Sequence, residues 1–139
     1  MTALPAMRLH HGAVSVPDLE ASIEWYSRVL EFTVEKRFEI QGERTQVAML
    51  NRGELRVELF EAAGSTPAHP DRREPNQDFR RQGNLHFAFA VPDVHALAEV
   101  VARRGANVVW VRDFEFGSTA FIRDNAGNLI EFVEQKGTI

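Results

Sequence analysis

The chain has 139 residues, a formal net charge of −4 and no cysteine. This length is typical of one domain, large enough to form a core without disulfides. The negative charge argues against nucleic acid as a partner, and without cysteine a metal site must use imidazole and carboxylate ligands. No signal-like or membrane-spanning apolar run is apparent, so we expect a cytoplasmic protein with no membrane partner.

An internal repeat organises the sequence. Val16-Pro17-Asp18-Leu19 recurs 75 positions later as Val91-Pro92-Asp93-Val94, and the same offset relates His11 to His86. Each copy ends an apolar or alternating run and begins a helical pattern. A repeat of this kind indicates that one structural unit is used twice.

The two copies predict the same elements in the same order. The first predicts a strand, a helix and three strands over 9–16, 18–30, 33–40, 44–51 and 54–60. The second predicts them over 84–91, 93–104, 107–112, 117–124 and 128–134. Asp18 and Asp93 stand at N-cap positions, Gly105 is suited to a helix C-terminus, and each helix has one apolar face to bury.

These patterns predict an α+β fold made of two βαβββ modules that face each other. The modules span about 9–60 and 84–134 and together make one domain over 1–139. We expect a curved, cup-shaped or barrel-like mixed sheet with the helices outside, because each helix must cover one sheet face.

The segment 61–83 between the copies is read as a long connection. It contains three prolines and no sustained periodicity, and connections of this length often have a role. If this connection has a function, Arg72-Arg73 and Arg80-Arg81 could bind an anionic group of a substrate. If it is only a surface loop, these arginines lie in solvent. Phe79 is the residue of this segment that we expect to pack inward.

Strand alternation predicts which side chains share the open face of each module. His11 shares a face with small residues in the first strand, and His86 does so in its repeat, while the opposite faces are bulky and apolar. In the last strand of each module, Glu58 and Glu131 interrupt apolar runs, where an unpaired carboxylate is costly to bury.

Taken one at a time, these four residues are ordinary: strand histidines and glutamates often lie in hydrogen-bonded or solvated positions. Their relation by one internal symmetry points to a metal site formed by His11, Glu58, His86 and Glu131, provided the modules face each other. Two imidazoles and two carboxylates suit one Zn, Ni, Co, Mn or Fe ion, and the residues do not choose among these. The other histidines, His10, His69 and His95, are left outside the site.

The sequence resembles the vicinal oxygen chelate superfamily, which includes glyoxalase I, epimerases, extradiol dioxygenases and bleomycin resistance proteins. The resemblance covers nearly the whole chain and rests on Leu9-His10-His11-Gly12, both Val-Pro-Asp corners, Trp25-Tyr26, Val57-Glu58-Leu59-Phe60 and the segment Asp124 to Glu131. By similarity, the four proposed ligands match the metal-binding positions of glyoxalase I. Epimerases of this group commonly carry glutamine where this chain has Glu58.

The resemblance implies a metal-dependent lyase or isomerase that acts on a small substrate with vicinal oxygens through an enediolate-type intermediate. Glu58 and Glu131 are the candidate bases, and the candidate substrate-contacting residues are Phe60, Trp110, Arg112, Phe121 and Arg37. Alternatives are a non-catalytic antibiotic-binding resistance protein and an iron-dependent extradiol dioxygenase. Small members of this superfamily commonly form homodimers, and the resemblance implies a homodimer here. The two modules that make one site then pair either within one chain or across the two chains of the dimer.

Overall fold

The computed structural model describes residues 2–137 of the chain. The first module contains β1 (Gly12–Ser15), α1 (Leu19–Leu30), β2 (Thr33–Ile40), β3 (Thr45–Arg52) and β4 (Leu55–Ala62). The second contains β5 (Phe87–Val91), α3 (Val94–Arg103), β6 (Asn107–Phe114), β7 (Gly117–Arg123) and β8 (Leu129–Glu134). Over the described residues, no helix combines the length and the apolar character that crossing a membrane requires.

Each module folds into its own four-stranded mixed sheet. The strand orders are β1-β4-β3-β2 and β5-β8-β7-β6, with the first strand of each module parallel to the last and the other pairs antiparallel. This confirms the predicted α+β fold of two βαβββ modules, with two curved sheets and no closed barrel. β1 and β5 are shorter than predicted, so His11 and His86 lie in the segments that lead into them.

The helices begin at the predicted aspartates. Asp18 accepts a hydrogen bond from Ala21 N at 3.1 Å, and Asp93 accepts one from Ala96 N at 3.0 Å. A second carboxylate reaches each helix start from the end of the same sheet: Leu19 N donates to Glu61 at 2.7 Å, and Val94 N donates to Glu134 at 3.2 Å. Both contacts satisfy free N–H groups of the first helical turn. The repeat therefore extends to the way each helix is joined to its sheet.

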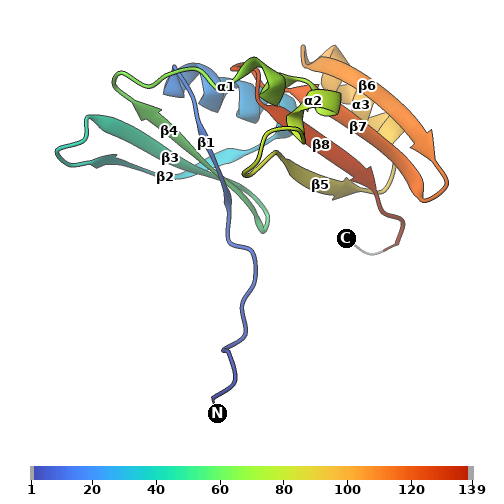
Figure 1. The fold of residues 1–139 in the computed structure, drawn as a ribbon, viewed down its shortest axis with the longest axis horizontal. Coiled ribbons are helices and arrows are strands. Elements are labelled where there is room, and N and C mark those ends of the chain that lie inside the picture. Colours follow the sequence, from blue (N-terminus) through green and yellow to red (C-terminus); the bar gives the residue numbers. More distant parts are fainter. Residues whose placement is uncertain (1, 138–139) are drawn as a thin grey trace.

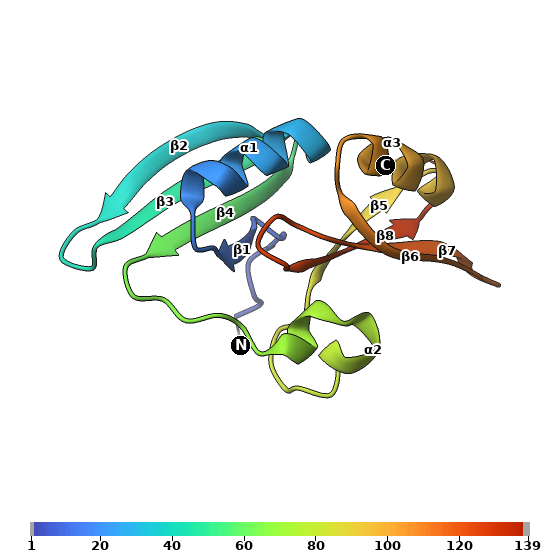
Figure 2. The same cartoon turned by 90° about the horizontal axis from the view of Figure 1, so that it is seen from above.

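The two modules lie side by side within one chain and do not face each other, with α1 and α3 on the same side of the sheets (Figures 1 and 2). One hydrophobic core runs through both modules and includes Tyr26 and Phe32 from the first and Ile122 and Phe132 from the second. The buried Tyr26 hydroxyl donates to Asp124 at 2.8 Å, which ties α1 to the turn before β8. Turning the modules toward each other would break this bond and expose shared core, so the face-to-face arrangement is wrong for a single chain.

The connection between the modules contains two short helices, η1 (Pro70–Arg73) and α2 (Pro75–Asp78). The expectation for Phe79 is wrong: its side chain is 61% exposed, and the Arg80 guanidinium lies 5.3 Å from its ring centroid. The adjacent Asp78 is buried instead, at 1% exposure. The single turn of α2 points Asp78 inward because two basic side chains meet its carboxylate there.

Candidate metal centre

Matching positions in the two sheets hold the four proposed ligands. His11 lies two residues before Ala13, which pairs with Glu58 across β1 and β4. His86 lies two residues before Ala88, which pairs with Glu131 across β5 and β8. The sequence offsets differ by two residues between the histidines and the glutamates, yet the sheet register is the same. Each module therefore presents one histidine beside one glutamate in one geometry.

The distance within each pair fits two ligands of one ion. His11 Nε2 lies 3.5 Å from Glu58 Oε1, and His86 Nε2 lies 3.4 Å from Glu131 Oε1. Two donor atoms held at about 2.1 Å from one metal at a tetrahedral angle are about 3.4 Å apart. All four side chains are partly exposed, between 14% and 33%. Each pair could thus supply two ligands to one ion and leave room for further ligands, and each pair is called a half-site below.

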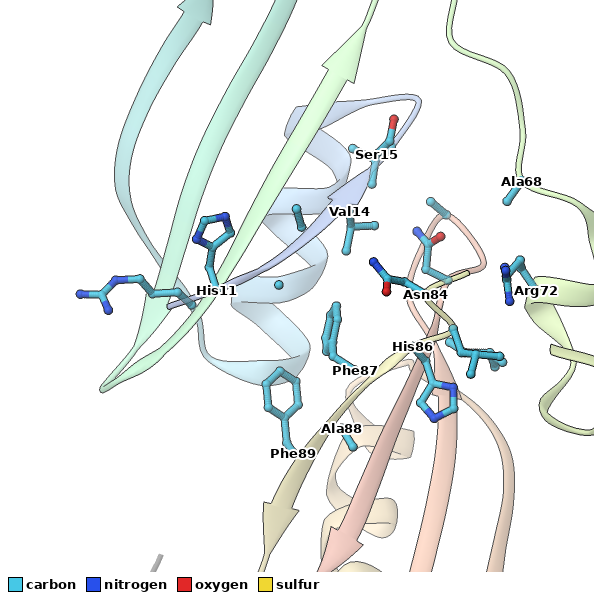
Figure 3. Close-up of a pocket in the computed structure, with 18 of the residues that line it drawn as sticks. His11, Val14, Ser15, Ala68, Arg72, Asn84, His86, Phe87, Ala88 and Phe89 are labelled. Carbon is cyan, nitrogen blue, oxygen red and sulfur yellow. The ribbon is translucent and has the colours of Figure 1, made fainter. Parts of the chain in front are cut away.

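The two pairs do not meet within one chain. Among residues 2–137, no three His, Cys, Asp or Glu side chains gather closely enough to hold an ion together. Figure 3 shows His11 beside β1 and His86 beside β5, well apart at the junction of the modules. The arrangement follows from the side-by-side packing of the modules, which leaves each half-site on the sheet face opposite the helices.

The first strand of each module exposes to solvent the face on which small side chains were predicted. Ala13 and Ser15 in β1 are exposed, as are Ala88 and Ala90 in β5. The alternate residues, Val14, Phe87 and Phe89, pack against the core. The strands come close at this junction: a Cβ added to Gly12 would lie 3.1 Å from the Phe87 ring.

Aromatic side chains line the open face next to the second half-site. Phe121 is directly opposite Glu131 in β8 and opposite Trp110 in β6. The Phe121 ring centroid lies 4.9 Å from that of His86 and 5.0 Å from that of Trp110, and the Arg112 guanidinium lies 4.3 Å from the Trp110 ring centroid. The side chains of His86, Phe121, Trp110 and Arg112 therefore form a row that runs outward from the second half-site.

The first half-site has a different wall. Met49 is buried opposite Glu58, and Phe60 lies two residues further along β4 on the same face. Arg37 does not belong to this wall. It is opposite Ala48, which belongs to the core under the helices, and it forms an ion pair with Glu20 of α1. This places Arg37 on the helix side of the sheet, away from the ligands, and we withdraw it as a substrate contact.

A groove of about 1160 Å³ runs along the junction of β1 and β5. Both histidines line it, together with Arg72 and Arg73 from the connection and the turn that precedes β8 (Figure 3). Arg72 thus lies close to the second half-site, whereas Arg80 and Arg81 do not line the groove.

Asp78 is the residue of this region that sequence reasoning missed. Its carboxylate lies 3.0 Å from His86 Nδ1, on the side of the ring opposite Glu131. The Arg72 guanidinium donates to the same carboxylate at 2.8 Å. No periodicity marks such a residue, since its partners lie six residues before it and eight after it and meet only in three dimensions.

The glyoxalase/bleomycin resistance protein/dioxygenase superfamily model matches residues 8–132. The chain belongs to this superfamily. A curated superfamily relative, lactoylglutathione lyase of Neisseria meningitidis, is 31% identical over 94% of this chain and 92% of its own length. A 2-epi-5-epi-valiolone epimerase of an Actinomyces species is 31% identical over 75% of this chain and 63% of its own length.

Solved structures of superfamily members share the fold. A glyoxalase family protein from Enterococcus faecalis superposes with a TM-score of 0.77 at 21% identity, covering 91% of this chain and 97% of that one. Glyoxalase I from Zea mays superposes with a TM-score of 0.73 at 25% identity, over 94% of this chain and 46% of that longer one. The two-module architecture is therefore that of the superfamily.

Proposed function

We propose that this chain is a metal-dependent lyase or isomerase whose active site forms between two subunits. The observation that carries the proposal is the pair of matched half-sites, His11 with Glu58 and His86 with Glu131, on open sheet faces of one chain. Each half-site supplies two ligands, and structural or catalytic transition-metal sites take three or four from the protein.

A twofold axis completes the set without any change within the chain. In a C2 dimer both subunits use the same surface. If the first module of one subunit faces the second module of its partner, the twofold axis creates the same contact a second time. Each site would then draw His11 and Glu58 from one subunit and His86 and Glu131 from the other. The donor set of two imidazoles and two carboxylates suits Zn, Ni, Co, Mn or Fe.

A divalent ion held by these residues would supply Lewis-acid stabilisation of negative charge on substrate oxygens. The chain's own contribution is the proton transfer. Glu58 and Glu131 are carboxylates on an open face, able to remove a proton from a carbon next to a carbonyl and return it to the neighbouring carbon or to the opposite side. Such a transfer covers both isomerisation and epimerisation.

The aromatic wall would exclude water and hold the substrate. Phe60, Trp110 and Phe121 offer apolar surface beside the two carboxylates, which strengthens electrostatic interactions at the reacting atoms. Arg112 is exposed and stacks on Trp110, so its guanidinium remains free to bind a carboxylate of the substrate.

The names of two relatives supply the first substrates to test. We infer that a glutathione hemithioacetal of a 2-oxoaldehyde is the leading one, because the Neisseria relative is named lactoylglutathione lyase and aligns over nearly its full length. The name of the Actinomyces relative favours an epimerisable substrate as the second.

Metal analysis of the purified protein, followed by activity assays of stripped and reloaded forms, tests the proposal. We expect about one ion per subunit, since a C2 dimer has two sites. We also expect activity on methylglyoxal hemithioacetals or on 2-epi-5-epi-valiolone that is lost on stripping and returns with metal. His86→Ala should lose metal, whereas the control His95→Ala should keep it. Wild-type protein that binds no metal, or His86→Ala that binds as well as wild type, would contradict the metal centre. Metal binding without activity on either substrate class would instead favour a binding protein. Uptake of dioxygen in the presence of a catechol would favour a dioxygenase.

A further inference from the structure

Asp78 is a buried carboxylate that the proposed chemistry does not use. It comes from α2 in the connection between the modules and is 1% exposed. Both of its oxygens are engaged: Oδ1 accepts from Arg72 Nη1 at 2.8 Å, and Oδ2 lies 3.0 Å from His86 Nδ1. A carboxylate at this depth is retained only with strong partners, since an unpaired buried charge is costly.

Arg72 fixes the orientation of that carboxylate. Besides Oδ1 of Asp78, the guanidinium donates to the backbone carbonyls of Asp78 at 3.0 Å and of Gln82 at 2.9 Å. These bonds close the connection around Asp78 just before the chain enters β5. Figure 3 shows Arg72 on the connection, on the side of the groove where β5 and His86 lie.

We propose that Asp78 is a positioning residue that holds the His86 ring with its proton on Nδ1 and directs the Nε2 lone pair toward Glu131. An ionised carboxylate only accepts hydrogen bonds, so the nitrogen that is hydrogen-bonded to Asp78, which is Nδ1 at 3.0 Å, must carry the proton. The opposite nitrogen, 3.4 Å from Glu131 Oε1, is then the one free to bind a metal. A carboxylate behind a ligand histidine also raises the basicity of that ligand.

Within residues 2–137, the first half-site has no buried carboxylate behind its histidine. His11 Nδ1 lies 2.7 Å from His10 Nδ1, and the His10 side chain is exposed. That contact leaves either nitrogen of either ring able to carry the proton. The repeat therefore yields two unequal half-sites: the second is held by a buried ion pair, and the first is held by an exposed neighbour.

Asp78→Asn is the sharpest test, because it preserves shape. The single amide oxygen should stay on the charged Arg72, which turns the NH2 group toward His86 Nδ1 and favours the proton on Nε2. We expect metal to bind about 10 to 100-fold more weakly, as when similar supporting groups are removed. The control is Asp71→Asn, which removes a partly exposed carboxylate of the same connection that pairs with Arg81, and it should leave metal affinity unchanged.

The position of the proton is measured directly by ¹⁵N NMR of histidine-labelled, metal-free protein at a pH where the imidazole is neutral. Wild-type His86 should carry its proton on Nδ1, and Asp78→Asn should move it to Nε2. This measurement needs no bound metal. The wild-type result also needs no mutation, so it remains informative even if the Asp78→Asn variant folds poorly.

The inference rests on the metal centre proposed above, but the two fail separately. A wild-type protein that binds no metal overturns the metal centre, while the NMR result still shows whether Asp78 controls His86. A wild type that binds metal, with Asp78→Asn equal in affinity, overturns the role of Asp78 and leaves the metal centre intact. Wild-type His86 with its proton on Nε2 overturns that role as well.

Discussion

Two variants that are each inactive alone are expected to restore one another when they share a dimer. His11→Ala damages the first half-site, and His86→Ala damages the second. If each site draws one half from each subunit, a mixed dimer has one site with both defects and one with neither. The mixed dimer should therefore bind about half of the wild-type metal and show about half of its activity, whereas each parent dimer should have neither.

The assay uses two differently tagged chains, expressed together and purified through both tags in turn, so that only mixed dimers are measured. Metal content and lyase activity are determined on the same samples. The side-by-side modules and the Tyr26–Asp124 bond keep the two half-sites of one chain apart, which is why restoration requires the second subunit.

A matched control uses two lesions in the same half-site. A mixed dimer of His11→Ala and Glu58→Ala chains has one defect in each site, so it should remain without metal. Failure of the His11→Ala and His86→Ala pair to exceed its parents would refute a site shared between subunits. Equal restoration in both mixed dimers would show that the half-sites are not the units we infer.

Three further predictions concern stability, pH and the base. Tyr26→Phe removes a buried hydrogen bond to the Asp124 carboxylate, and denaturant unfolding should show a loss of about 1 to 3 kcal/mol; an unchanged midpoint would mean that the bond between the modules contributes nothing. The hydrogen bond that His95 donates to the Asp113 carboxylate raises the pKa of His95 above its ordinary 6.5. This pair therefore stabilises the fold fully below that value and loses its effect as pH rises through the raised pKa. Asp113→Asn should lower the pKa of His95 in an NMR titration, and an unmoved titration would contradict the pairing. Glu58→Gln keeps an oxygen ligand but removes a base, and we expect metal content to persist while kcat falls by about 100-fold or more; an unchanged kcat would leave Glu131 as the sole candidate base.

Alternation along the strands was enough to predict which face each ligand occupies. His11 and Glu58 lie on one open face, and His86 and Glu131 on the other. The positions of the modules relative to each other were not predictable in this way. That placement is set by contacts far apart in the sequence, such as Ser22 to Asn125, which are 103 residues apart. Local periodicity carries no information about such contacts.

The buried residue of the connection between the modules also could not be predicted from local sequence patterns. Phe79 was chosen as the inward residue because it is the large apolar side chain of its segment. The structure buries the neighbouring Asp78 instead, since the Arg72 guanidinium and the His86 ring both bind its carboxylate and offset the cost of desolvation. Arg37 failed for a related reason: β2 is exposed along nearly its whole length, so its sequence pattern did not show which face carries the helix.

The equal sheet register of the two modules has a consequence for how such a protein arises. A chain of one module would carry one histidine and one glutamate, and two copies of it would supply the same four ligands. Duplication within a single gene then joins two half-sites that already match, with no new ligand required. Asp78 lies in the connection that such a fusion introduces, so the repeat has no second copy of it. In such a fused chain the two histidines are no longer equivalent, because His86 contacts Asp78 while His11 contacts His10.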